Sequence, residues 1–322
     1  MIIKNKKIKV AVLDDYQNVT YNFANWNSLE DQIELTVFNE YIGKDKNLIN
    51  KLIDFNVICL MRERTPLPET MINKLPNLEL VITSGMWNAS IDLNALHKRK
   101  ILCCGTDTKN NSTAELAWML IMIGWRGLQV EIQNMKDGKW QTTVGRGLKG
   151  KTLGIFGLGK QGTQVASFAK AFGMKVIAWS HNLTKEACNQ LEIEYVSSDQ
   201  LFRNSDILSI HTRLSNRTNG FINEEKLNLM KKKSLLVNTS RGPIINEIDL
   251  IKCLQNKSIG GAALDVFDLE PLPVSHRLRS MPNVILTPHI GYVSSEAYEK
   301  FYEGYVLAIK AFLDNSPINV IS

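Results

Sequence analysis

The sequence predicts an α/β protein made of two domains, each built on a parallel sheet. The chain has 322 residues, which is too long for one ordinary hydrophobic core. Short apolar runs alternate with segments of helix length almost from end to end, as parallel strands joined by helical crossovers do. The series of strands starts again after residue 150, so we expect two sheets.

Composition and charge limit the class of protein. Hydrophobic residues make up 44% of the chain and charged residues 22%, which is ordinary for a globular protein. The net charge of +6 is spread along the chain, so we expect small anionic substrates and no nucleic-acid partner. No apolar run reaches the roughly 18 residues of a membrane span, so we expect no membrane partner.

The cysteines indicate a reduced, cytoplasmic protein without a metal site. There are five, an odd number, and none is in a CxxC pair. The adjacent Cys103 and Cys104 could bind a metal or react, but free cysteine mostly behaves as a small buried hydrophobe. We therefore interpret this pair as apolar residues near a strand end.

The first half of the chain predicts four strands and a long helix. The strands are expected at 8–15, 57–61, 78–85 and 101–105. The segment 112–138 is periodic and apolar, and either Ser112 or Thr113 is a suitable N-cap. We expect one long helix here, joining the two domains.

The second half repeats the alternation with a new set of strands. They are expected at 151–159, 174–180, 206–212, 234–240, 261–267 and 283–289. The last segment, 294–315, has the pattern of an amphipathic helix that could pack on either domain.

The stretch GLGKQG (157–162) between a strand and a helix predicts a dinucleotide site. Gly157 permits a tight turn, Gly159 lets the backbone approach a pyrophosphate, and Gly162 lets the helix pack closely on the strand. Lys160 and Gln161 lie at the start of that helix, whose N–H groups and dipole favour phosphates. A glycine-rich turn without a ligand is the alternative.

The expected ribose-binding acid is missing from the turn after the next strand. A carboxylate usually follows the glycine loop by about 20 residues, but Ser180, His181 and Asn182 occupy this turn. An arginine, the usual partner of a 2′-phosphate, is absent from it too. We therefore expect NAD or NADP as the cofactor, with weak discrimination and with NADP tolerated.

Three polar residues follow three of the predicted strands. Arg241, Glu270 and His289 are each aimed at the edge of the sheet that carries the glycine loop, where ligands of such sheets bind. Singly, each could be structural. Together they suit hydride transfer to a 2-oxoacid: arginine binds a carboxylate, and histidine with a carboxylate partner exchanges a proton.

These segments make the chain resemble the D-isomer-specific 2-hydroxyacid dehydrogenases. The resemblance lies in the glycine-loop segment, LVNTSRGPIINEIDLIKCL, GAALDVFDLEPLP and LTPHIGY, and more loosely in VITSGMWNASID and NSTAELAWMLIM. It implies that Arg241 binds substrate, Glu270 supports the base and His289 transfers the proton. Family members usually form homodimers through their nucleotide domains, so we expect a homodimer.

The resemblance also implies a domain arrangement and a fold for each domain. A Rossmann nucleotide-binding domain at 112–292 would be inserted into a flavodoxin-like substrate domain formed by 1–111 and 293–322, with the last helix on the substrate domain. The chain ends soon after that helix, so we expect no regulatory extension of the phosphoglycerate dehydrogenase type.

Further site residues follow from the resemblance. It implies cofactor contacts at Thr113, His211, Thr239, Ser240 and Asp265, although His211 fits a structural histidine at a strand end equally well.

For the substrate, it implies that the turn SGMWNAS, through Ser84, Gly85 and Met86, binds a carboxylate; a simple βα turn is the alternative. Arg62 and Arg64 would favour a doubly anionic or polar substrate, or be solvated loop residues. The bulk of Met86 and Trp87, and Tyr292 at a position where the family often has glycine, leave the substrate open.

The function we expect is an NAD(P)-dependent D-2-hydroxyacid dehydrogenase that reduces a glyoxylate- or hydroxypyruvate-like acid. A phosphoglycerate-type dehydrogenase is a second possibility. A formate dehydrogenase fits less well, because formate oxidation needs no proton acceptor of the histidine–glutamate kind. An NAD(H)-sensing corepressor on this fold is the alternative outside enzymes.

Overall fold

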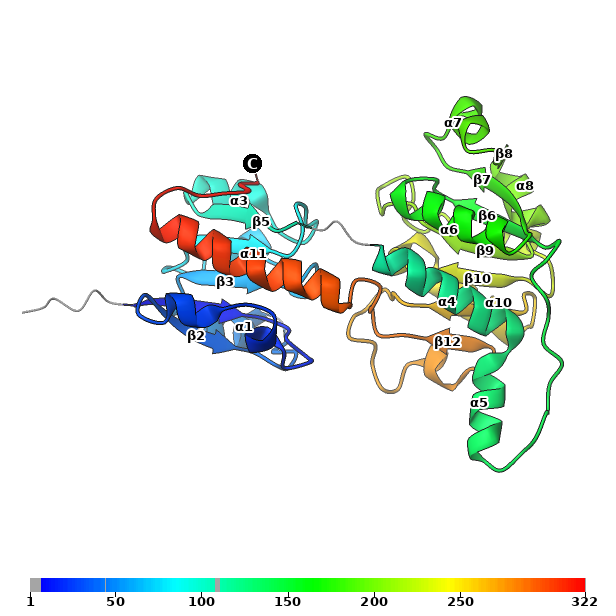
Figure 1. The fold of residues 1–322 in the computed structure, drawn as a ribbon, viewed down its shortest axis with the longest axis horizontal. Coiled ribbons are helices and arrows are strands. Elements are labelled where there is room, and N and C mark those ends of the chain that lie inside the picture. Colours follow the sequence, from blue (N-terminus) through cyan, green and yellow to red (C-terminus); the bar gives the residue numbers. More distant parts are fainter. Residues whose placement is uncertain (1–6, 44, 108–110, 322) are drawn as a thin grey trace, which may run out of the picture. The chain divides into compact units, whose positions relative to one another are not determined.

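The computed structural model describes residues 7–43, 45–107 and 111–321. The fold separates into two compact units, Met1–Asn110 with Val293–Ser322 and Asn111–Tyr292 (Figure 1). We call them the five-stranded and the seven-stranded unit after the sheets found in the described residues. Both sheets are parallel, which confirms the expected α/β class. No helix in the described ranges is long and apolar enough to cross a membrane.

The five-stranded unit has the strand order β2-β1-β3-β4-β5, which is the order of flavodoxin-like sheets. Its strands are β1 (Ile8–Val12), β2 (Ile33–Val37), β3 (Val57–Leu60), β4 (Leu80–Thr83) and β5 (Leu102–Gly105). Its helices are α1 (Asp45–Leu52), α2 (Glu69–Ile72), α3 (Leu93–Lys98) and α11 (Ser295–Leu313). Short 3₁₀ turns cover Thr20–Asn22 and Trp26–Leu29.

The core of this unit follows from the register of its strands. Ala11, Ile58, Val81 and Cys103 are neighbours across β1, β3, β4 and β5, and all four are buried in one hydrophobic cluster. Such rows arise because parallel strands covered on both faces need continuous apolar runs. Cys103 therefore is a core residue, as its position near a strand end suggests.

Helix α11 packs on the five-stranded sheet, in contact with β4 and β5 (Figure 1). Ser294 caps its start by accepting a hydrogen bond from the Ala297 N–H. Tyr305, which is fully buried, donates its hydroxyl proton to the Leu60 carbonyl at 2.8 Å. The amphipathic pattern alone left open which domain this helix covers, whereas the family resemblance implied the substrate domain.

The seven-stranded unit has the strand order β12-β11-β10-β9-β6-β7-β8. Its strands are β6 (Thr152–Phe156), β7 (Lys175–Trp179), β8 (Glu194–Tyr195), β9 (Ile207–Ile210), β10 (Leu235–Asn238), β11 (Gly261–Leu264) and β12 (Val284–Leu286). If β6 is counted as strand 1, the order from β8 to β11 is the 3-2-1-4-5-6 order of a Rossmann sheet. Strand β12 is one more strand at the end. The order reverses between β6 and β9, where such sheets bind their ligands.

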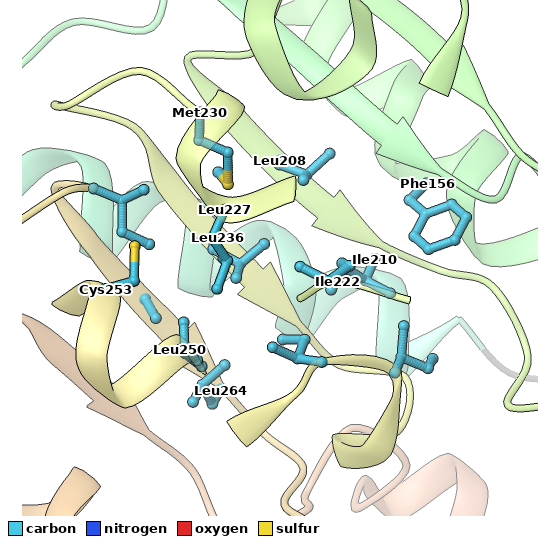
Figure 2. Packing of buried hydrophobic residues seen from close by; sticks show 14 of the residues in the cluster. Phe156, Leu208, Ile210, Ile222, Leu227, Met230, Leu236, Leu250, Cys253 and Leu264 are labelled. Atoms are coloured by element: carbon cyan, nitrogen blue, oxygen red, sulfur yellow. The ribbon is translucent and has the colours of Figure 1, made fainter. Parts of the chain in front are cut away.

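Helices cover both faces of this sheet. They are α4 (Ser112–Arg126), α5 (Leu128–Lys136), α6 (Lys160–Ala171), α7 (Lys185–Gln190), α8 (Ser198–Asn204), α9 (Glu224–Leu229) and α10 (Glu247–Gln255), with 3₁₀ turns at Gly242–Ile244 and Arg277–Ser280. Leu235 and Val237 point to the face covered by α4 and α6, and Leu236 to the other. Figure 2 shows Leu236 on that second face, near Leu250 of α10.

The expected long helix at 112–138 is wrong: the segment forms two helices, α4 and α5, separated at Gly127. Gly127 has φ +67° and ψ +26°, a left-handed conformation that glycine adopts freely and that ends a helix. Helix α5 buries none of its residues. Apolar periodicity continues across the break, which is why the sequence reads as one helix.

Two strands were not expected from the sequence, β2 and β8. Both lie at sheet edges, and both are partly or fully exposed. Edge strands need no continuous apolar run, so a search for such runs misses them.

Candidate active site

The glycine loop between β6 and α6 has the geometry expected of a dinucleotide cradle. Gly157 has φ +103°, and an added Cβ would lie 2.6 Å from the Thr212 nitrogen. A Cβ on Gly162 would lie 2.2 Å from the Gly157 carbonyl oxygen. Gly159, which precedes α6, has no atom within 4 Å of that position. The loop therefore packs tightly on one side and leaves its backbone open where a pyrophosphate would approach.

Two buried polar atoms, one at the start of α6 and one after β10, fit a bound ligand. Within the described residues, Gln161 Oε1 and Thr239 Oγ1 are buried without a hydrogen-bond partner. Buried polar atoms normally have partners, so such exceptions suggest a missing molecule. Lys160 is exposed at the first position of α6, whereas Ser240 donates its hydroxyl proton to the Thr212 carbonyl.

The turn after β7 is ordered by aromatic packing. The ring of His181 lies 4.9 Å from the Trp179 ring and 5.1 Å from the Phe221 ring. Partial burial lowers the pKa of His181, and the guanidinium of Arg217 lowers it further. His181 therefore favours its neutral form, and the neighbouring Ser180 is half-buried.

An arginine from elsewhere in the chain reaches this turn. Arg217 Nη2 donates to Asn182 Oδ1 at 3.1 Å, across 35 residues of sequence. The turn itself contains no arginine, as the sequence indicates, but the fold brings one to it from the loop after β9. Sequence spacing gives no signal for this contact.

The turn after β10 presents Arg241 and is held by Asn238. The Asn238 side chain accepts from the Ser240 N–H at 3.0 Å and donates to the Arg241 carbonyl at 2.9 Å. A Cβ on Gly242 would lie 2.1 Å from the carbonyl carbon of Phe267. Sequence reasoning missed both Asn238 and Gly242, although a buried asparagine at a strand end is a usable signal.

His289 and Glu270 form a close pair. His289 Nδ1 lies 2.6 Å from Glu270 Oε2, and Glu270 Oε1 accepts from the Phe267 N–H at 2.9 Å. His289 has φ +52°, which is uncommon for a residue other than glycine. The Tyr292 ring stands edge-on to the imidazole at 5.6 Å. The carboxylate thus fixes the histidine ring, as the sequence suggests.

Asp265 fastens the loop that carries His289. Its carboxylate accepts hydrogen bonds from the Thr287 hydroxyl and from the Ile290 and Gly291 N–H groups. Burial raises the pKa of Asp265, while these hydrogen bonds act in the opposite direction. Asp265, which is expected to contact the cofactor, therefore positions the His289 loop within this unit.

Two other expected cofactor residues have partners within the seven-stranded unit. Thr113 donates its hydroxyl proton to the Gly291 carbonyl at 2.9 Å. His211 Nε2 lies 2.8 Å from Ser209 Oγ, and burial lowers the pKa of His211 to about 4. His211 is therefore neutral at pH 7.

The strand order brings the three proposed catalytic residues to neighbouring positions. Arg241 follows β10, Glu270 follows β11 and His289 follows β12, and these strands are adjacent in the sheet. The glycine loop follows β6 at the same carboxyl edge. Contact is seen between Glu270 and His289, and the backbone of the Arg241 turn packs on the Phe267 peptide through Gly242.

The expected substrate residues lie in the five-stranded unit. Arg62 Nη1 donates to the Ser84 carbonyl at 2.9 Å, and the Arg62 N–H donates to Ser84 Oγ at 2.8 Å. The Gly85 N–H donates to Thr106 Oγ1 at 3.0 Å. Met86 has an exposed side chain. Arg62, Ser84 and Gly85 thus build this turn through bonds of their own.

Arg64 contacts other residues of the five-stranded unit, and Cys103 and Cys104 are buried. Arg64 donates to the Asp14 carbonyl at 2.7 Å and lies over the Tyr16 ring. Burial raises the pKa of Cys103 to about 12 and that of Cys104 to about 11. Across the described ranges, no group of three or more metal-ligating side chains lies together.

Known proteins share these features. A family model described as "D-isomer specific 2-hydroxyacid dehydrogenase, NAD binding domain" matches residues 118–291, more than half of the chain. Glyoxylate reductase of Thermococcus litoralis is 35% identical over 263 residues, covering 78% of this chain and 79% of that protein. D-3-phosphoglycerate dehydrogenase of Bacillus subtilis is 36% identical over 241 residues, which is 74% of this chain but 46% of that protein.

Solved structures agree. The crystal structure of phosphoglycerate oxidoreductase from Vibrio cholerae O395 is similar with a TM-score of 0.90 and 34% identity, covering 96% of this chain and 99% of that one. The resemblance expected from the sequence is thereby confirmed. The chain belongs to the D-isomer specific 2-hydroxyacid dehydrogenase family, whose members are oxidoreductases.

Proposed function

We propose that this protein reduces a small 2-oxoacid, of the glyoxylate or hydroxypyruvate type, to a D-2-hydroxy acid with NADH or NADPH. The observation that carries the proposal is the 2.6 Å contact between His289 Nδ1 and Glu270 Oε2. His289 follows β12 and Arg241 follows β10, and β11 lies between these two strands in the sheet. The similarity to a glyoxylate reductase supports this substrate class.

The proton in this reaction is assigned to His289. With its Nδ1 proton donated to Glu270, the ring has Nε2 available for exchange with the substrate oxygen. Glu270 stabilises the protonated ring and fixes its orientation, since its other oxygen is held by the Phe267 N–H. The oxygen that becomes the hydroxyl thus receives its proton from His289 Nε2.

Arg241 is assigned to the substrate. A guanidinium presents a planar fork that can bind both a carboxylate and the neighbouring carbonyl oxygen. The turn that carries it is fixed by Asn238, so the backbone beneath Arg241 is in place before substrate binds. Binding orients the carbonyl and favours the charge that develops on its oxygen.

A bound nicotinamide dinucleotide would supply the hydride. Gly157, Gly159 and Gly162, with the first turn of α6, would hold its pyrophosphate. Gln161 and Thr239 offer buried oxygens that lack a partner in the described chain. The remaining cofactor residues in the proposal are Lys160, Ser180, His181, Asn182, His211, Ser240, Asp265 and Thr113.

On the five-stranded unit, the turn at residues 84–86 would bind the substrate carboxylate. Since the Gly85 N–H donates to Thr106 Oγ1, we assign the carboxylate to the Met86 N–H. Arg62 then acts mainly by ordering the turn through Ser84. A substrate with one carboxylate fits this arrangement.

A panel of 2-oxoacids assayed with NADH and with NADPH tests the proposal. We expect turnover of glyoxylate or hydroxypyruvate, and a loss on the order of 10²–10⁴ in rate for His289→Ala. Turnover of 3-phosphohydroxypyruvate alone would favour the phosphoglycerate-type activity named for the Bacillus relative. No turnover of any 2-oxoacid, with tight dinucleotide binding, would favour a sensor.

We also infer a homodimer formed through the seven-stranded unit. Helix α5 buries none of its residues, and Leu128, Ile132 and Met135 are exposed on it. On α4, Met119 and Met122 are exposed too. Exposed apolar side chains on these two consecutive helices favour a protein partner. Sedimentation should give twice the mass of 36.4 kDa, and Ile132→Glu should shift it to one copy.

The expected location is the cytoplasm. The five cysteines are all buried and none is in a disulfide, which suits a reducing compartment. The proposed dinucleotide cofactor is found in that compartment as well. Fractionation of cells that express the protein would check this.

A further inference from the structure

Arg217 occupies a specific position at the proposed adenine-ribose end of the dinucleotide site. It follows β9, and its Nη2 donates to Asn182 Oδ1 at 3.1 Å. Asn182 belongs to the turn after β7, where Rossmann sheets bind the ribose that carries the adenine. The guanidinium is also near enough to lower the pKa of His181 in the same turn.

The loop that carries Arg217 is fixed from within. The neighbouring Thr218 is buried, and its hydroxyl donates to the Arg213 carbonyl at 2.8 Å. The same oxygen accepts from the Ser215 N–H at 2.8 Å, and the Asn219 N–H donates to the Ser215 carbonyl at 2.9 Å. Arg217 therefore extends from a closed turn, and its backbone does not have to be ordered when a ligand binds.

The loop is also fastened to the turn after β7. Phe221 stacks on Trp179 with ring centroids 5.4 Å apart, and it meets the His181 ring edge-on at 5.1 Å. The Gly220 N–H donates to the Pro243 carbonyl at 2.7 Å. Because one rigid group of rings joins the two segments, the distance between Arg217 and the residues of the turn is built into the fold.

The turn after β7 lacks the carboxylate that binds the ribose of NAD, and it has groups that can bind the 2′-phosphate of NADP. A carboxylate would accept from the ribose hydroxyls of NAD and repel a 2′-phosphate. The turn has Ser180 and Asn182 in place of an acid. A guanidinium binds phosphate through a charged, planar fork, and a neutral His181 can add a hydrogen bond to such a ligand.

We propose that Arg217 is the residue that recognises the 2′-phosphate of NADP(H), together with Ser180, and that it makes the protein prefer NADP(H) to NAD(H). The inference rests on the dinucleotide site of the proposed function. It replaces the weak discrimination expected from the sequence, because the cation absent from the turn is supplied from the loop after β9. Asn182 orients the guanidinium by accepting its hydrogen bond.

The test measures binding directly, by titration calorimetry of the full chain with NADP⁺, NAD⁺, 2′,5′-ADP and 5′-AMP. We expect NADP⁺ to bind at least about tenfold more tightly than NAD⁺, and 2′,5′-ADP more tightly than 5′-AMP. Arg217→Ala should weaken NADP⁺ and 2′,5′-ADP by about tenfold to a hundredfold, the range for a charged hydrogen bond. Binding of NAD⁺ and 5′-AMP should change by less than about twofold.

Arg203 provides a matched control. It is exposed at the end of α8, on the segment that enters β9 rather than the one that leaves it. Arg203→Ala removes the same charge from the opposite edge of the sheet, and we expect all four affinities to stay unchanged. Ser180→Asp restores the missing carboxylate and should reverse the preference towards NAD⁺. Circular dichroism of each variant checks that it folds.

The outcomes separate the two proposals. Tighter binding of NAD⁺ than NADP⁺ by the unmodified protein, or an equal loss of both in Arg217→Ala, would overturn the role of Arg217 and leave the dehydrogenase site intact. An equal loss in Arg217→Ala and Arg203→Ala would reduce the effect to general charge and overturn it too. Binding of neither dinucleotide would refute both the role of Arg217 and the proposed function.

Discussion

The imidazole of His289 is oriented by Glu270, with 2.6 Å between Nδ1 and Oε2. The carboxylate is itself fixed, because its second oxygen accepts from the Phe267 N–H. On the other side, Asp265 holds the backbone of the His289 loop through Ile290 and Gly291. The histidine is therefore positioned by one acid acting on its ring and another acting on its main chain.

Glu270→Gln should reduce the rate of 2-oxoacid reduction. The amide keeps the shape of the side chain but lacks the negative charge that faces Nδ1 of the His289 ring. We expect kcat to fall by on the order of 10²-fold at pH 7. The measurement is kcat at saturating 2-oxoacid; an unchanged kcat would remove Glu270 from this role.

Replacement of Arg241 should separate charge from shape. Arg241→Ala should raise KM and lower kcat, with a combined loss of about 1.5–3 kcal/mol in transition-state binding. Arg241→Lys keeps the charge but loses the planar fork, so its kcat/KM should lie between that of the unmodified protein and that of Arg241→Ala. Equal values for Lys and Arg at this position would mean that the fork is not used.

Gly242→Ala should destabilise the seven-stranded unit. The added Cβ would lie 2.1 Å from the Phe267 carbonyl carbon, and backbone cannot yield as a flexible side chain does. We expect a loss of about 3 kcal/mol in the free energy of unfolding. Gly147→Ala is the control, because no atom lies within 4 Å of its added Cβ. Urea denaturation of both variants checks this, and equal stabilities would contradict it.

The free energy of unfolding should decrease as the pH drops below about 6.5, because His211 is buried in the folded protein. Burial lowers the pKa of His211 in the folded protein to about 4, from an ordinary value of 6.5. Between these values the unfolded chain binds more protons than the folded one, so stability rises with pH across this window by up to about 1.4 kcal/mol per pH unit. Above 6.5 this contribution is complete.

His211→Gln should reduce that slope while keeping a polar group beside Ser209. The measurement is the free energy of unfolding from urea titrations between pH 4 and 6.5. A slope that is the same in both proteins would show that folding does not lower the pKa of His211.

The sequence is sufficient to place the local parts of this candidate site on the sheet. GLGKQG carries its own context, since the strand before it and the helix after it are visible in the pattern. Arg241, Glu270 and His289 can be assigned to one edge because parallel strands all end there. Each of these inferences needs only the strand positions and the direction of the sheet.

Contacts between distant segments could not be predicted in this way. Arg217 reaches Asn182 through the packing of Phe221 on Trp179, and nothing in the spacing indicates that these rings meet. Gly242 needs to be glycine only because the Phe267 peptide lies against it. The break at Gly127 depends on one backbone conformation that apolar periodicity does not record.

The hydrogen bond from Thr113 to the Gly291 carbonyl joins the two ends of the seven-stranded unit. Thr113 stands just inside the first residue of the seven-stranded unit and Gly291 just before its last, so the unit starts and finishes in one place. An excised segment 111–292 would have its ends side by side, and a short linker could join them at little cost in entropy. The unit is therefore suited to circular permutation, with new ends opened in an exposed loop such as the one that follows α5.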